Sequence, residues 1–275
     1  PDVAGAINGL AVRLHAERVP DGSPILDGLN PSNSNDQQTI TEIRRRYARA
    51  ELEWFIPRGS HSDQFGLLKD NRHRYFKIGV DYVYVFGNKP ASNYEKEIRN
   101  NVPGANSNSS TGIGQDVWNS IIDLKQDGNG QSRDASFRIR MQGDYANFVM
   151  NGNPRLDANQ ADADTLHWRE GVHLPEWHDG NWHLWTVRAL WHPTNGHIYV
   201  WFDDRLVFSR VGVCTCFNDS NVGQGPYTKG GAYDADFLSD ADTGSNVKDV
   251  MFDFMGIGLY DPEGNGIPKY KNSAA

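Results

Sequence analysis

The stretch TITEIRRRYARAELEWFI, residues 39–56, predicts a β-strand with one buried face and one polar face. In an extended chain, alternate side chains fall on one side, here Ala48, Ala50, Leu52, Trp54 and Ile56. The other side carries charged and aromatic residues, namely Arg45, Tyr47, Arg49, Glu51 and Glu53. Such a row suits the floor of a groove that binds a polar, anionic chain molecule. A solvated sheet face has a similar pattern, so both interpretations stay open at this point.

Length and composition favour one β-rich domain. With 275 residues, 38% of them hydrophobic, the chain can bury one sizeable core, and all-β sandwiches of this length occur as single domains. Its 28 glycines and 13 prolines supply the turns that a protein of many short strands needs. The formal charge of −8 argues against general binding of nucleic acid or anionic membranes. A local basic groove remains compatible with it, because arginines cluster between residues 44 and 49.

Membrane, leader and metal signals are weak in this chain. No run approaches the ~20 apolar residues of a membrane span, so we expect no membrane partner. The sequence shows no signal peptide and begins at Pro1 without Met, from which we expect a trimmed chain. Cys214 and Cys216 predict two thiols or one tight local bridge. Six histidines lie between residues 167 and 197, but Pro175 would interrupt a helix that aligned them, so we expect no catalytic metal.

Segments rich in aromatic and β-branched residues, separated by turn residues, predict roughly ten to twelve strands. The expected strands span residues 11–16, 39–56, 75–86, 117–125, 136–150 as a hairpin, 182–191, 197–202, 205–211 and 248–260. Residues 57–72, 87–115, 151–181 and 212–246 are expected to be loops. No segment shows helical periodicity over three or more turns. The pattern predicts an all-β protein, an antiparallel two-sheet sandwich or jelly roll with a concave groove.

The sequence shows no domain linker and no internal repeat, so residues 1–275 are expected to form one domain. Residues 1–38 are rich in Pro, Gly, Asn and Asp and predict an N-terminal arm. The polar loop over residues 87–115 exceeds the length of about 15 residues that compact domains usually allow. It is interpreted either as a lid beside the groove or as a disordered excursion.

Four motifs resemble those of the concanavalin-A-like polysaccharide lyases, a group that includes alginate lyases, glucuronan lyases and heparin lyase I. Arg49-Ala-Glu-Leu52 resembles the Arg-Ala/Ser/Thr-Glu-Leu strand of that family. Residues 118–122 (WNSII) resemble the start of the strand that ends in Gln-x-His. Residues 180–204 resemble its hairpin Gly-x-Trp … Gly-x-Ile-x-Val-Trp-x-Asn-Gly, and residues 254–260 (FMGIGLY) its last strand, Tyr-Phe-Lys-x-Gly-x-Tyr. The shared order of the motifs carries the resemblance.

Two motifs depart from the family pattern. Where the family has Gln-x-His, this chain has Asp123-Leu-Lys125, or residues 124–126 if the register shifts by one. The first Tyr and the Lys of the last motif are replaced by Phe254 and Met255. The acid and base are therefore altered, or the protein is a binding protein on a lyase scaffold.

The resemblance implies β-elimination at a uronic acid within a polysaccharide. One group must neutralise the uronate carboxylate, a base must take the neighbouring proton, and an acid must protonate the leaving glycosidic oxygen. Arginine suits the first task, because its planar guanidinium binds a carboxylate through two hydrogen bonds and stays charged. Arg49 is the candidate, with Glu51 on the same strand face holding its orientation. An ordinary cross-strand salt bridge is the alternative.

Three residues are candidates for the base and the acid. Lys125 serves as a base or a carboxylate binder, although Asp123 on the same strand face would favour its charged form and so weaken it as a base. His73 is a second candidate base, because a neutral imidazole accepts a proton near pH 7 and glucuronan lyases similarly place a histidine early in the chain. Tyr260, at the second Tyr of the family's last motif, is the candidate acid. A solvated lysine, a loop histidine and a packed aromatic are the corresponding structural alternatives.

Substrate contacts are assigned to five further residues of the expected groove: Arg45, Tyr47, Asp123, Arg140 and Trp201. Trp201 is chosen among the tryptophans because it shares a strand face with Tyr199 and His197, and this mixed polarity suits a groove.

The expected function is therefore a secreted polysaccharide lyase whose partner is an anionic polysaccharide or oligosaccharide. A non-catalytic carbohydrate-binding jelly roll is the alternative, and a glycoside hydrolase with paired carboxylates comes third. The chemistry requires no cofactor. A structural calcium ion is common in this architecture, but no ligands can be assigned to one. We expect a monomer that binds neither nucleic acid nor membranes.

Overall fold

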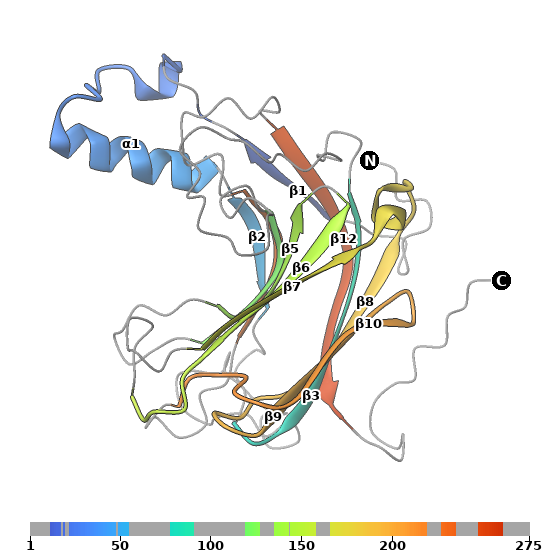
Figure 1. The fold of residues 1–275 in the computed structure, drawn as a ribbon. Coiled ribbons are helices and arrows are strands. Elements are labelled where there is room, and N and C mark those ends of the chain that lie inside the picture. The colour runs from blue at the N-terminus through green and yellow to red at the C-terminus, as the bar shows by residue number, and fades with distance from the viewer. Residues whose placement is uncertain are drawn as a thin grey trace, which may run out of the picture.

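Two six-stranded antiparallel β-sheets lie face to face in the computed structural model (Figure 1). It describes residues 12–17, 19, 22–47, 49–54, 78–90, 119–126, 135–142, 144–157, 166–218, 227–234 and 247–260. The first sheet contains, in spatial order, β1 (Val12–Glu17), β12 (Val247–Leu259), β3 (Asp81–Pro90), β8 (His183–Leu190), β9 (Gly196–Phe202) and β10 (Arg205–Val213). The second contains β2 (Arg49–Trp54), β11 (Tyr227–Asp234), β4 (Asn119–Lys125), β5 (Ala135–Gln142), β6 (Tyr145–Gly152) and β7 (Leu166–His173). The predicted two-sheet antiparallel sandwich is confirmed.

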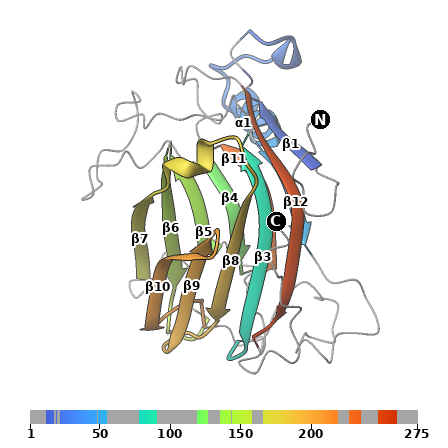
Figure 2. The same cartoon turned by 90° about the vertical axis from the view of Figure 1, so that its right-hand side faces the viewer.

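The hydrophobic core fills the space between the two sheets. Alternate residues of β8 and β9 are fully buried, among them Trp185, Val187, Ile198 and Val200. They pack in one cluster with Phe137 and other apolar residues of β4, β5 and β6. The same period of two leaves every second residue of these strands facing away from the core. Figure 2 shows the strand order of both sheets, with the short helix η2 (Pro175–His178) at one end.

Most predicted strands and hairpins are confirmed, but two expected loops contain strands. β7 lies within residues 151–181, and β11 lies within residues 212–246. Both have weak strand signals: β7 is an edge strand with four charged or imidazole side chains, and β11 contains two adjacent glycines. The strand predicted at residues 75–86 starts at Asp81, after a turn at Gly79 with a positive φ. Residues 91–115 of the predicted lid lie outside the described residues.

A helix, α1 (Ser34–Tyr47), occupies most of the segment that was predicted to be the first part of the long strand. Asn33 caps its N-terminus by accepting a hydrogen bond from the backbone N–H of Asn35 at 2.9 Å. Ile40 is buried one turn before Ile43, and it packs with residues ahead of the helix in a small separate cluster. The prediction that Arg45 and Tyr47 continue the strand face of Arg49 is therefore wrong, because both belong to the helix and β2 begins after it.

Residues ahead of the helix pack against it. β1 confirms the strand predicted near residues 11–16, and the short helix η1 (Pro24–Leu26) follows. Leu26 and Val19 are buried against Ile40, and the Arg44 side chain donates a hydrogen bond to the carbonyl of Val19 at 3.3 Å. Among the described residues, no helix has the length and apolar character needed to cross a membrane.

Candidate active site

The second sheet turns a polar surface away from the core. Ile122, Leu124, Ile139 and Met141 belong to the core cluster, so Asp123 and Lys125 on β4 and Arg138 and Arg140 on β5, which alternate with them, point to the opposite side. A register irregularity between Ser120 and Ile122 places Ser120 opposite Arg140, although Ile121 belongs to the core. We call this surface the polar face. Its described side chains are Ser120, Asp123, Lys125, Ser136, Arg138, Arg140, Tyr145, Asn147, Asn151 and Lys229. Most of them are buried although they face away from the core.

Strand register orders the polar face into rows, because residues directly opposite each other in an antiparallel pair share one face. The first row runs across the strands β2, β11, β4, β5 and β6 as Arg49, Tyr233, Ser120, Arg140 and Asn147. The second row runs as Glu53, Lys229, Asp123, Arg138 and Val149. On β5 the two rows are two residues apart, a distance of about 7 Å. The register thus brings the Arg49 motif of β2 to the same surface as two arginines of β5.

Asp123, Ser120 and Arg138 form a hydrogen-bonded unit on this face. One carboxylate oxygen of Asp123, Oδ1, accepts hydrogen bonds from the Ser120 hydroxyl and from Arg138 Nε, the latter at 2.6 Å. The side chains of Asp123 and Arg138 are each only 8% exposed. Asp123, which is predicted to contact substrate, also holds an arginine of the neighbouring strand.

A phenol and an imidazole lie together at the end of the polar face. Tyr145 and His173 occupy opposite positions on β6 and β7, and their ring centroids are 4.8 Å apart. Tyr145 is two residues from Asn147 of the first row. The polar face therefore carries a phenol beside an imidazole at its β6–β7 end.

Basic positions outnumber acidic ones on the polar face, in contrast to the whole chain. Register places Arg49, Lys125, Arg138, Arg140, Arg169 and Lys229 on it, against Glu51, Glu53 and Asp123. The chain as a whole has 27 basic and 35 acidic residues. The positive excess of this face gives it the sign required to attract an anionic ligand.

Five of the ten predicted site residues meet on the polar face. Arg49 and Glu51 occupy its register positions on β2, Asp123 and Lys125 those on β4, and Arg140 lies on β5. His73 lies outside the described residues. Trp201 and Tyr260 are not part of this surface, and Arg45 and Tyr47 belong to the helix α1.

Trp201 and Tyr260 lie on the outer side of the first sheet. Trp201 alternates with the buried Val200 and Phe202 and stacks beside Tyr199, with ring centroids 5.8 Å apart. Tyr260 follows β12, and the guanidinium carbon of Arg188 lies over its ring, 3.3 Å from the ring centroid. The expectation that these two residues line one groove with Arg49 is therefore wrong, because the core separates the two faces.

The sequence contained a better match to the last family motif than residues 254–260. Tyr227-Thr-Lys229-Gly-Gly231-Ala-Tyr233 agrees with Tyr-Phe-Lys-x-Gly-x-Tyr at both tyrosines, the lysine and the glycine. Residues 254–260 agree only at the glycine and the last tyrosine. The structure forms β11 from this segment and pairs it with β2 and β4. The spacing Tyr-x-Lys-x-Gly-x-Tyr was the signal that could have placed these residues.

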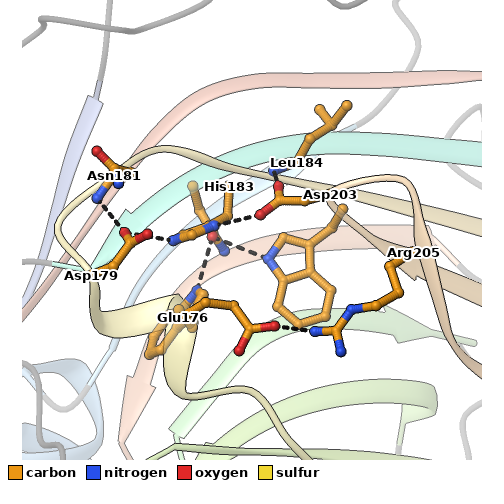
Figure 3. Close-up of polar contacts among 10 residues, drawn as sticks. Glu176, Asp179, Asn181, His183, Leu184, Asp203 and Arg205 are labelled. Atoms are coloured by element: carbon orange, nitrogen blue, oxygen red, sulfur yellow. Dashed lines mark hydrogen bonds and ion pairs between the residues drawn. The ribbon is translucent and has the colours of Figure 1, made fainter.

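A second polar cluster lies at one end of the first sheet and serves the fold (Figure 3). Buried His183 lies between two carboxylates: its Nδ1 is 2.7 Å from Asp203 and its Nε2 is 3.2 Å from Asp179. Burial alone would raise the pKa of the Asp179 carboxyl, but hydrogen bonds from Asn181 and the neighbouring His183 lower it below its ordinary value. An ion pair between Glu176 and Arg205 joins the same segments. These contacts hold η2 against the turn between β9 and β10.

The cysteines are free thiols and no metal site is formed within the part of the chain described here. Cys214 and Cys216 are both buried and unbridged. Burial raises the pKa of the Cys214 thiol to about 11. Among the described residues, no group of three or more His, Cys, Asp or Glu side chains could hold a metal ion.

Comparison with known sequences places the chain in a family. The family model described as polysaccharide lyase matches residues 66–255. That match covers more than half of the chain, so the protein belongs to this family and is a polysaccharide lyase. No protein with a curated description matches the chain significantly.

Several solved structures match the chain in a structural comparison. An endo-beta-1,4-glucuronan lyase from the fungus Trichoderma reesei is 14% identical, with 91% of this chain and 81% of that chain covered and a TM-score of 0.52. Alginate lyase A1-II', a member of polysaccharide lyase family-7, is 11% identical over 70% of this chain and 67% of that chain, with a TM-score of 0.42. The binding domain of botulinum neurotoxin serotype C1 is 9% identical over 67% and 35%, with a TM-score of 0.39. At such low identity, the likeness to the glucuronan lyase shows the shared jelly-roll fold alone.

Proposed function

We propose that this polysaccharide lyase cleaves a uronate-containing, anionic polysaccharide by β-elimination on the polar face of its second sheet. The observation that carries the proposal is the first row, in which Arg49 of β2 lies opposite Tyr233 of β11 and three strands from Arg140 of β5. This row provides arginines that can bind a carboxylate and a tyrosine with a phenol group. It lies on the face where basic positions outnumber acidic ones.

Neutralisation of the uronate carboxylate is the first requirement of the reaction. The proton on the carbon next to the carboxylate becomes acidic only when the negative charge that develops there is stabilised. Arg49 is proposed for this role, supported by its position on β2 and by the family motif it begins. Arg140, in the same row, supplies a second guanidinium. Glu51 is proposed to orient Arg49 from the same strand.

Two proton transfers complete the elimination. A base takes the proton from the carbon next to the carboxylate, a carbon–carbon double bond forms, and the bond to the glycosidic oxygen breaks. An acid then gives its proton to that leaving oxygen. We assign the acid to β11, whose Tyr227 and Tyr233 fit the tyrosine positions of the family motif. Lys125, directly opposite Tyr227, and His73 remain the candidate bases.

Three expectations accompany the proposal. We propose that the protein acts outside the cell, where the polymers of this substrate class occur, and that it works as a monomer. The elimination itself needs no metal or other cofactor. A calcium ion, if bound, would stabilise the fold, so a chelator should lower the melting temperature without abolishing elimination.

Incubation with a panel of polymers tests the proposal. Alginate, glucuronan, heparin, hyaluronan and ulvan should be offered separately, together with one neutral polysaccharide. Elimination leaves an unsaturated sugar at the new non-reducing end, so ultraviolet absorbance should rise with at least one of the uronate polymers and not with the neutral one. New reducing ends without absorbance would instead indicate hydrolysis, and retardation in a polysaccharide-containing gel with neither signal would indicate a binding protein.

A further inference from the structure

A pair of aromatic rings lies on the outer side of the first sheet, away from the candidate active site. Tyr199 and Trp201 alternate along β9 with the buried Val200 and Phe202, so both rings point away from the core. Leu206 of β10 lies directly opposite Trp201 and is 51% exposed. We call Tyr199, Trp201 and Leu206 the aromatic strip. In Figure 2 the first sheet lies in front of the second, so the outer side of β9 faces the viewer.

Packing in the core does not account for the aromatic strip, because none of its three side chains belongs to the core cluster. Large apolar side chains that are exposed next to one another often mark a binding surface. The centroids of the Tyr199 and Trp201 rings are 5.8 Å apart and their planes are within 26° of parallel, so each ring limits the motion of the other. Side chains that are already held in place lose less freedom when a ligand binds to them.

The charges beside the aromatic strip are already paired with one another. Arg188 of β8 lies opposite Tyr199, and its guanidinium carbon is 5.5 Å from the centroid of that ring. Arg188 donates two hydrogen bonds to Asp81 Oδ2, from Nε at 3.0 Å and from Nη2 at 2.7 Å. His197 Nε2 lies 3.1 Å from the same oxygen. A ligand of the strip is therefore recognised by its apolar faces and its hydroxyls rather than by its charge.

A sugar ring has these properties, because one side of it presents C–H groups and its edge carries hydroxyls. An indole or a phenol ring packs against the C–H side and also offers a polar group for a hydrogen bond. The protein is a polysaccharide lyase, so its substrate is a polymer of such rings.

A second copy of the protein fits this surface less well. Small polar side chains flank the two rings on the neighbouring strands, with Thr186 opposite Trp201 and Ser209 opposite Tyr199. The strip is therefore narrow, whereas a stable interface buries about 800 Å² on each partner around a largely apolar centre.

We propose that the aromatic strip is a second carbohydrate-binding surface, on which sugar rings of the polysaccharide substrate stack against Tyr199 and Trp201. The core separates the strip from the polar face, so the strip holds the enzyme on its polymer while another segment or another chain is cleaved. Such tethering raises the effective concentration of cleavable bonds at the active site. In this role Trp201 contacts substrate, as the sequence led us to expect, but outside the active site. The inference depends on a polysaccharide substrate and not on the uronate proposed above.

Electrophoresis in gels that contain a polysaccharide tests the strip. The gel should contain the polymer of the panel that retards the wild type most, and the runs should be short and cold to limit cleavage. Trp201→Ala should raise the apparent dissociation constant about tenfold, as loss of an aromatic contact implies. Its kcat and KM on a short soluble oligosaccharide should stay within about twofold of the wild-type values. Trp201→Tyr should restore most of the retardation and Trp201→Leu should not, because leucine fills space without offering a ring. The difference between the wild type and Trp201→Ala should persist after the carboxyl groups of the polymer are reduced to alcohols.

Several outcomes would overturn the inference. Retardation of Trp201→Ala equal to that of the wild type would do so, and so would equal restoration by leucine and tyrosine, which a packing role predicts. A dimer in sedimentation that Trp201→Ala dissociates would show that the strip binds a second copy instead. The matched control is Ile25→Ala, which removes an exposed apolar side chain of η1 and should leave retardation unchanged. If Trp201→Ala does not fold, Tyr199→Ala should show the same loss, and no loss in that variant also contradicts the proposal.

This inference and the proposed function fail in different experiments. Absence of elimination by the wild type on every uronate polymer would contradict the proposed function, and retardation that depends on Trp201 would still support the strip. Elimination by a wild type whose retardation does not depend on Trp201 would contradict only this inference.

Discussion

Arg49 lies directly opposite Tyr233 in the antiparallel pair of β2 and β11, and Tyr233 lies opposite Ser120 of the next strand, β4. The family motifs at Arg49 and at Tyr233 therefore lie on neighbouring strands of one sheet. This pairing also makes a tyrosine of β11 the candidate acid in place of Tyr260, which follows β12.

The tyrosines of β11 should matter for activity, and Tyr260 should not. Replacing Tyr227 and Tyr233 by Phe one at a time should lower kcat in at least one variant by about 10²–10⁴-fold, the usual contribution of a general acid. Tyr260→Phe removes a hydroxyl from the outer side of the first sheet and is the matched control, with kcat unchanged. Full activity in both β11 variants, or a large loss of kcat in Tyr260→Phe, would contradict the assignment of the acid to β11.

The strands of this protein differ in how clearly the sequence predicts them. β8 and β9 alternate between large apolar and polar side chains, so their hairpin, their register and their buried residues could be predicted from the sequence. β11 could not be found in this way, because two adjacent glycines occupy its centre. The tyrosine, lysine and glycine spacing of that segment was the available signal.

The helix was missed for a different reason. Among the described side chains of α1, only Ile40 and Ile43 contact an apolar cluster, and that cluster is small and separate from the core. A helix with so narrow an apolar stripe carries little periodic signal. The strand that follows alternates clearly, and extending its pattern backwards placed Arg45 and Tyr47 on the wrong element. The polar unit of Ser120, Asp123 and Arg138 likewise depends on pairing between strands, which the sequence does not contain.

Asn88 should be essential for stability although it does not belong to the active site. Its side-chain oxygen accepts hydrogen bonds from two buried indoles, Trp177 Nε1 and Trp185 Nε1, each at 3.2 Å. Asn88→Ala leaves both donors buried without this partner and should lower the free energy of unfolding by about 2–6 kcal/mol. Denaturant unfolding measures the change. Thr186→Ala, at a half-buried outward position of β8, should change it by no more than about 0.5 kcal/mol, and an equal effect in the two variants would refute the role of Asn88.

Asp179 should contribute to stability in a pH-dependent manner. Its pKa is lowered in the folded protein, so its contribution is present above the unfolded value of about 4 and disappears as the pH falls through the lower folded value. Asp179→Asn should therefore be less stable than the wild type at neutral pH, and the difference should shrink at acidic pH. Urea unfolding across this range measures it, with the exposed Asp27→Asn as control. A difference that grows as the pH falls below about 4 would contradict the lowered pKa of the Asp179 carboxyl.

The cysteines should be unreactive in the folded protein. With a pKa of about 11, Cys214 is a thiolate in only about one molecule per thousand at pH 8, and burial hinders access to it as well. Alkylation should therefore modify neither cysteine in the native protein within minutes and both in denaturant. Failure to label them in denaturant without a reductant would show a bridge instead of free thiols.

Elimination by an Arg49 variant tests the central claim most directly. The rate of ultraviolet absorbance increase should be measured with the polymer that the wild type cleaves best, for Arg49→Ala and for Arg155→Ala, which removes an exposed arginine from a turn beyond the polar face. Loss of the guanidinium that stabilises the developing charge should lower kcat/KM by about 10²–10³-fold, while Arg155→Ala retains the wild-type value. Arg49→Ala that cleaves the polymer as fast as the wild type would contradict the assignment of the active site to the polar face.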